Sequence, residues 1–84
     1  MKNCYITFRS VTPAQRGEGM LRRDGIDCML SRTPRWMEQQ GCGYCLRLRQ
    51  SQAARAVQLL RGGGVHYQRV YLLREDGTAE ELMV

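Results

Sequence analysis

Gly43-Tyr44-Cys45-Leu46-Arg47-Leu48-Arg49 is the stretch of this sequence with the clearest period of two residues. Its aromatic and leucine side chains alternate with cysteine and arginine side chains, which predicts a β-strand with two unlike faces. An apolar face on the core would leave the other face polar and basic. The apolar face would hold Tyr44, Leu46 and Leu48, and the opposite face Cys45, Arg47 and Arg49.

The residues after this strand predict a helix and a further strand. Ser51 is a suitable helix N-cap, and the glycines at 62–64 are a typical helix end. Apolar residues between them follow helical spacing. These are Ala53, Ala56, Val57 and Leu60. Residues 65–74 then predict a strand, which Glu75-Asp76-Gly77 follows as a turn.

The residues before the quoted stretch predict two more strands and one more helix. Residues 2–8 and 26–32 are rich in strand-forming side chains, and residues 33–41 read as a loop. Thr12 and Pro13 are a typical helix start, and Asp24-Gly25 is a typical helix end. Gly17, inside that helix, would let it approach a sheet closely.

The predicted order is therefore β-α-β-β-α-β, the ferredoxin-like arrangement of an α+β domain. We expect a four-stranded antiparallel sheet with both helices on one face, since right-handed crossovers place them together. The other face would be open. The 84 residues predict one domain, with a core at about 2–74 and a short acidic tail at 75–84.

Charge and composition narrow the class of protein. The net charge is +5, and all 13 basic residues precede position 75, so the body of the domain suits an anionic partner. No apolar run is long enough for a membrane span, and the first residues lack the apolar stretch of a signal peptide. We therefore expect a cytoplasmic protein without a membrane segment.

The four cysteines point to thiol chemistry in the segment Cys42-Gly43-Tyr44-Cys45. Glycine on both sides of Cys42 allows a sharp turn whose N–H groups, with a nearby arginine such as Arg47, would favour a thiolate. Cys45 would be a second, resolving thiol. Cys4 and Cys28 sit in predicted strands and are expected to be buried apolar residues. One Cys-x-x-Cys pair is too few ligands for a zinc ribbon, so no metal and no cofactor are expected.

The sequence resembles the selenium/sulfur carrier-like family of small domains over about residues 4–74. The resemblance rests on Tyr5-Ile6-Thr7-Phe8-Arg9-Ser10, on Ala14, and on the helix end from Leu21 to Gly25-Ile26. Its sharpest part is Cys42-Gly43-Tyr44-Cys45-Leu46-Arg47, which is similar to the family pattern Cys-Gly-x-x-Leu-Arg. The resemblance implies a compact α+β domain with a carrier cysteine at Cys42, supported by Gly43 and Arg47. Cys45 stands where a small residue is expected.

We therefore expect a carrier rather than a turnover enzyme, with a persulfide or perselenide on Cys42 and protein donors and acceptors of sulfur or selenium. One alternative is a nucleic-acid-binding module that uses the basic open sheet face, where Tyr5, Thr7, Arg69 and Tyr71 would lie beside the third strand. Weak, nonspecific contact with nucleic acid is expected from charge alone. A regulatory interaction domain without chemistry is the other alternative. The open face could also form a homodimer.

Overall fold

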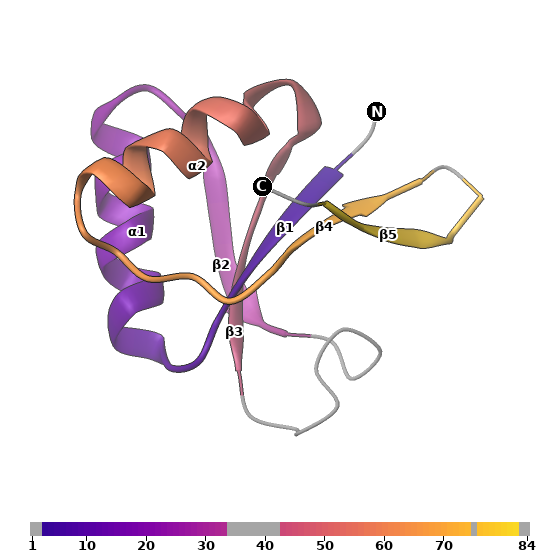
Figure 1. The fold of residues 1–84 in the computed structure, drawn as a ribbon, viewed down its shortest axis with the longest axis horizontal. Helices are drawn as coiled ribbons and strands as arrows, with labels where there is room; N and C mark the ends of the chain where they lie inside the picture. Colours follow the sequence, from indigo (N-terminus) through magenta and orange to yellow (C-terminus); the bar gives the residue numbers. More distant parts are fainter. Residues whose placement is uncertain (1–2, 34–42, 75, 83–84) are drawn as a thin grey trace.

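The computed structural model describes residues 3–33, 43–74 and 76–82 of the chain. Within them two helices and a set of strands form an α+β domain, as the sequence predicts (Figure 1). The elements are β1 Asn3–Phe8, α1 Val11–Arg23, β2 Cys28–Arg32, β3 Tyr44–Arg49, the 3₁₀ helix η1 Gln50–Gln52, α2 Ala53–Gly62, β4 Val70–Leu73 and β5 Ala79–Leu82. The predicted loop at 33–41 lies outside the described residues except for Thr33.

The strands form one antiparallel sheet of five strands in the order β2-β3-β1-β4-β5. The expectation of four strands is wrong, because the acidic segment after the turn adds β5 at the edge. Three of its four residues are exposed, so it lacks the apolar alternation that identifies a strand in a sequence. Backbone pairing with β4 and an ion pair of 2.7 Å between Arg74 and Glu80 hold it in place.

The predicted adjacency of the first and third strands is confirmed, and the pairing aligns their apolar faces. Ile6 is opposite Leu46, and Cys4 is opposite Leu48. Both helices lie on the same side of the sheet (Figure 1). The core lies between the two layers, where Leu21 of α1 and Leu60 of α2 belong to the same buried cluster as these strand residues.

Gly17 sets how closely α1 approaches the sheet and its neighbouring helix. A methyl group at this position would lie 3.1 Å from Leu60 Cδ2, 3.3 Å from Phe8 Cζ and 3.4 Å from Leu46 Cδ1. These distances are at or below ordinary van der Waals contact, so any larger side chain would force the layers apart. The predicted close approach at Gly17 is confirmed.

The helix starts differ from those predicted from the sequence, whereas the helix ends agree. Ser10, with extended backbone, is the N-cap of α1, and Thr12 is already helical. Ser51 lies within η1, and Gln52 is the N-cap of α2. Neither N-cap residue makes a side-chain capping hydrogen bond, so the capping preference of the side chain does not set where either helix begins. Among the described residues no helix is long and apolar enough to cross a membrane.

Candidate functional site

The predicted carrier thiol, Cys42, lies outside the described residues, but its neighbour Gly43 is within them. Gly43 is half-buried and directly precedes β3. Its carbonyl oxygen accepts a hydrogen bond of 3.0 Å from the N–H of Thr33. This bond continues the β2–β3 ladder past its last strand pair, Arg32 with Tyr44. The residue after Cys42 is therefore held at one end of a rigid pair of strands.

Cys45, the second thiol of the motif, is fully buried on the sheet face opposite the helices. It stands in β3 between Thr7 of β1 and Ser31 of β2. Its exposed fraction is 0%. The Cys45 Sγ lies 3.5 Å from Ser31 Oγ and 4.0 Å from the carbonyl oxygen of Arg32. The thiol therefore sits in a small polar setting of hydroxyl and carbonyl oxygens.

The protonation of Cys45 follows from this burial. Desolvation raises the pKa of the Cys45 thiol above its ordinary value, since a buried thiolate loses its hydration. The hydroxyls of Ser31 and Thr33, followed by the charge of Arg47, act in the opposite direction and offset only part of the rise. Cys45 is thus held as a neutral thiol near neutral pH, and a neutral thiol is a poor nucleophile.

Two hydroxyl residues near Cys45 were not singled out from the sequence. Ser31 contacts the thiol directly, and Thr33 lies close enough to lower its pKa. Thr33 Oγ1 is buried and has no hydrogen-bond partner in good geometry within the described part of the chain. Alternation along β2 places Met29 and Ser31 on one face, but the contact with Cys45 also requires the observed register between β2 and β3.

Arg47 lies four residues along β3 from Gly43 and contacts the neighbouring strand β2. An extended strand rises about 3.3 Å per residue, so Arg47 is about 13 Å along β3 from Gly43. Its Nη2 donates to Sδ of Met29 at 3.4 Å, across the β2–β3 pair. Met29 is 54% exposed, which makes this a surface contact. The effect of Arg47 that the described residues show is electrostatic, since its charge lowers the pKa of Cys45.

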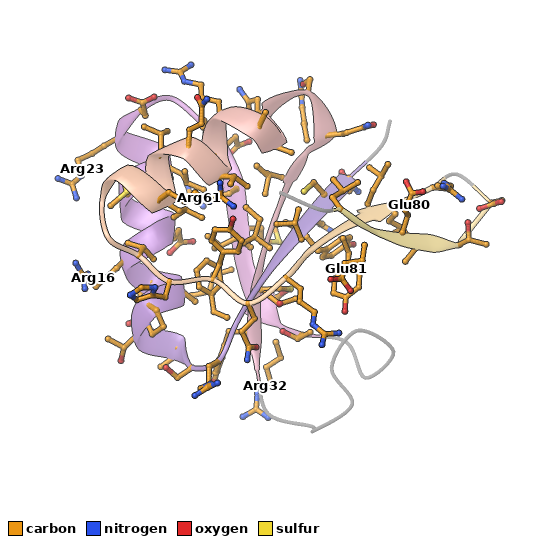
Figure 2. The ribbon with its side chains drawn as sticks, in the orientation of Figure 1. Arg16, Arg23, Arg32, Arg61, Glu80 and Glu81 are labelled. Atoms are coloured by element: carbon orange, nitrogen blue, oxygen red, sulfur yellow. The ribbon has the colours of Figure 1, made fainter. Side chains whose placement is uncertain are left out.

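Arg32 is brought close to Gly43 by the pairing of β2 with β3, and sequence reasoning missed it. It is the last residue of β2 and is paired with Tyr44. Its guanidinium carbon lies 5.9 Å from the centre of the Tyr44 ring, a distance suited to a cation–π contact. In Figure 2 the Arg32 side chain lies at the end of the sheet where β3 begins. Positive charge is therefore present at this end of the sheet.

The other two described thiols belong to the core. Cys4 and Cys28 are both members of the buried cluster. Burial raises the pKa of Cys4 to about 11 and also raises the pKa of Cys28. In the described ranges no three His, Cys, Asp or Glu side chains are placed to share a metal ion.

The sheet face opposite the helices carries the residues predicted for it, but its charge is mixed. Tyr5 is paired with Tyr71, and Thr7 stands beside Cys45. Glu81 of β5 is opposite Tyr71, and its Oε1 lies 3.7 Å from Nη1 of Arg69. The acidic strand thus offsets part of the positive charge on which nucleic-acid binding would depend. Neither nucleic-acid binding nor a homodimer is favoured by this arrangement.

Comparison with known proteins gives one family match. The model of the family described as "Putative Se/S carrier protein-like" matches residues 3–72, which include β1 to β3, both helices and most of β4. No curated protein and no solved structure matches the chain. The matched range includes all four cysteines and the whole Cys42–Arg47 motif.

Proposed function

Because the chain belongs to the Se/S carrier-like family over residues 3–72, we propose that it carries a sulfur or selenium atom on Cys42. The observation behind this proposal is the family match across the segment Cys42-Gly43-Tyr44-Cys45-Leu46-Arg47. The anchored position of Gly43 supports it, because a carrier thiol needs a fixed base from which to meet different partners. The proposal is a carrier or accessory protein rather than a turnover enzyme.

The transfer that we propose is a thiol exchange without net oxidation. The Cys42 thiolate attacks the terminal sulfur of a donor persulfide, and the S–S bond within the donor breaks. The donor leaves as a thiolate, and Cys42 becomes a persulfide, a reversible modification of cysteine. An acceptor thiolate then attacks the same terminal sulfur and restores the Cys42 thiolate. A perselenide would pass on selenium by the same sequence of bond changes.

Charge near Gly43 supports a thiolate at the neighbouring position. Arg32, the last residue of β2, is paired with Tyr44 beside Gly43, and Arg47 adds a positive charge farther along β3. Nearby positive charge lowers the pKa of a thiol and raises its thiolate fraction. In this proposal Gly43 supplies backbone access, because it carries no side chain that would obstruct an approaching partner.

We propose Cys45 as a resolving thiol only for an opened state of the domain. Its full burial and raised pKa keep it from attacking a persulfide in the closed state. An opening that separates Ser31 from Cys45 would expose the thiol and lower its pKa together. Attack by Cys45 on a Cys42 persulfide at its inner sulfur would then release hydrosulfide and leave a disulfide between the two cysteines.

The partners in this proposal are donor and acceptor proteins, and the proposed location is the cytoplasm, where thiols stay reduced. We also infer a ferredoxin-like classification. It is supported by the order of the first four strands in the sheet and by the two helices that share one face. The acidic strand β5, Ala79–Leu82, would then be an addition to this arrangement.

The test is intact-protein mass spectrometry after treatment with sodium polysulfide and removal of excess reagent. The wild-type protein should gain the mass of one sulfur atom, and dithiothreitol should reverse the gain. Cys42→Ser should abolish the gain and leave the circular dichroism spectrum unchanged. Cys28→Ser is the matched control, because it removes a thiol from the same chain at a buried position of β2.

The result that would overturn the proposal is retention of sulfur by the Cys42→Ser protein at the wild-type level. Peptide mapping then shows which other cysteine was loaded. Loss of loading in both serine variants would also contradict it, because Cys28 would then contribute as much as Cys42. Incubation with a perselenide in place of the polysulfide distinguishes the two cargoes, since the two atoms differ clearly in mass.

A further inference from the structure

A cleft separate from the cysteine motif lies where β1 turns into α1, beside the segment that connects α2 to β4. Its volume is about 460 Å³. This is within the range of about 300–1,000 Å³ that is typical of pockets for small molecules. Its lining residues are Arg9, Ser10, Pro13, Arg16, Gly64, Val65, His66, Tyr67 and Gln68.

The charge of this cleft is one-sided. Arg9 and Arg16 line it, and His66 adds an imidazole, whereas no aspartate or glutamate is among the described residues that line it. Neither arginine takes part in an ion pair with any carboxylate of the described residues. Other exposed arginines do have such partners, including Arg55 with Asp24 and Arg74 with Glu80. The two guanidinium groups at the cleft are therefore available to an anion from outside the chain.

The far wall of the cleft is fixed by backbone hydrogen bonds to β1. The N–H of Gln68 donates to the carbonyl oxygen of Thr7 at 2.7 Å, and the N–H of Thr7 donates to the carbonyl oxygen of Arg69 at 2.8 Å. Arg9 follows two residues after Thr7, so both walls are tied to the same strand. A cleft with fixed walls loses little conformational entropy when it binds a ligand.

We propose that this cleft binds a small molecule that carries a phosphate group. A guanidinium is a planar fork of donors that matches phosphate oxygens, and two of them suit a dianion better than a single carboxylate. Ser10, the N-cap of α1, makes no side-chain capping bond. The Ser10 hydroxyl, which lines the cleft, is therefore a further hydrogen-bond donor beside the two arginines. The polar side chains of Gln68 and Tyr67 line the remaining space and would contact the rest of the molecule.

The cleft and the cysteine motif lie at the same end of the sheet. Phe8, which precedes Arg9, is paired with Tyr44, which follows Gly43. An anionic ligand in the cleft would thus lie near the start of β3. The binding itself needs no thiol, so the proposal stands or falls independently of the carrier function. A Cys42→Ser protein should bind as the wild type does.

The test is a titration of ¹⁵N-labelled protein followed by amide chemical shifts at constant ionic strength. The probes are adenosine 5′-monophosphate, inorganic phosphate and, as the control without phosphate, adenosine. The first two should cause saturable shifts at the amides of residues 9–16 and 64–68, and adenosine should not. Arg16→Gln should weaken the binding of adenosine 5′-monophosphate about tenfold, as expected for one lost charge-assisted hydrogen bond.

Arg23→Gln is the matched control, because it removes the same charge from the same helix at a position outside the cleft. In Figure 2 both arginines lie along α1, well separated from each other. The affinity of Arg23→Gln for adenosine 5′-monophosphate should stay within about twofold of the wild type, since remote surface charges are screened by salt. An equal loss in both variants would overturn the proposal and indicate general charge attraction. Equal shifts with adenosine, or no saturation with any probe, would overturn it as well.

Discussion

The hydroxyl oxygen of Thr7 lies 3.0 Å from the backbone nitrogen of Arg69, and it accepts a hydrogen bond from that N–H. The same hydroxyl lies 3.3 Å from the carbonyl oxygen of Arg69, to which it donates. Thr7 is almost fully buried in β1, and its own backbone also pairs with residues 68 and 69. One side chain therefore fastens the segment before β4 to the centre of the sheet.

Thr7→Val should destabilise the domain although it preserves the shape of the side chain. The substitution removes the acceptor of the Arg69 N–H and the donor to its carbonyl oxygen. Loss of a partner for a buried polar group costs about 1–3 kcal/mol. Urea unfolding of the two proteins measures the difference. An unchanged midpoint would show that water replaces the hydroxyl without cost. Thr12→Val, at an exposed position of α1, is the control for the substitution itself.

Two glycines of α1 should respond in opposite directions to substitution. At Gly19 no atom lies within 4 Å of the position that a methyl group would occupy, so Gly19→Ala should stabilise the helix by about 0.5–1 kcal/mol. Gly17→Val should destabilise the protein by about 1–3 kcal/mol, because its side chain would meet Leu60 and Phe8. Thermal unfolding ranks the two variants. A Gly17→Val protein as stable as the wild type would mean that α1 moves away from the sheet without penalty.

The sequence predicted the central strands and both helices because their residues are buried on one side. Leu46 and Leu48 alternate with polar residues, so the period of the strand follows from its burial. The edge strand β5 leaves no such pattern, since Glu80 and Glu81 are both exposed. Its position depends on backbone pairing with β4, which single residues do not reveal.

The candidate site was predicted less completely, for a similar reason. Alternation correctly placed Cys45 on the face of Arg47, but it could not show that this thiol is fully buried. The contact with Ser31 depends on the register between β2 and β3, and those strands are separated in the chain. Arg32 was overlooked because its nearness to Gly43 depends on the same register.

The free energy of unfolding should decrease in alkaline solution partly because of Cys4. Burial raises its pKa from 9.0 to about 11 in the folded state, so above about pH 9 the unfolded chain releases this proton first. The unfolded state then binds fewer protons, and stability is lost as the pH rises from about 9 to about 11. The contribution is about 1 kcal/mol at pH 10, on a scale of about 1.4 kcal/mol per pKa unit.

Cys4→Ala should remove this part of the pH dependence. The free energies of unfolding of the variant and the wild type are measured in urea at about pH 8 and about pH 10. Their comparison separates the effect of the Cys4 proton from that of other groups that titrate in alkaline solution. The variant loses the same packing at both pH values, whereas only the wild type loses stability through Cys4 at the higher pH. The difference in free energy of unfolding between the two proteins should therefore be smaller at about pH 10. A gap that is the same at both pH values would contradict the raised pKa of Cys4.

The order in which the thiols react is the sharpest prediction for the carrier site. Cys4, Cys28 and Cys45 are all buried with raised pKa values, so alkylation by iodoacetamide near neutral pH should be slow at each of them. Cys42, which has a glycine on each side in the sequence, should be modified first. Time-resolved alkylation with peptide mapping of the native protein measures the four rates. In urea the four rates should become similar, which would show that folding causes the difference between them.

If Cys42 reacts as slowly as Cys4 and Cys28 in the native protein, it is not a carrier thiol, and the motif is structural. Ser31→Ala provides the last comparison: it removes the hydroxyl beside Cys45 and should leave the rate at Cys42 unchanged.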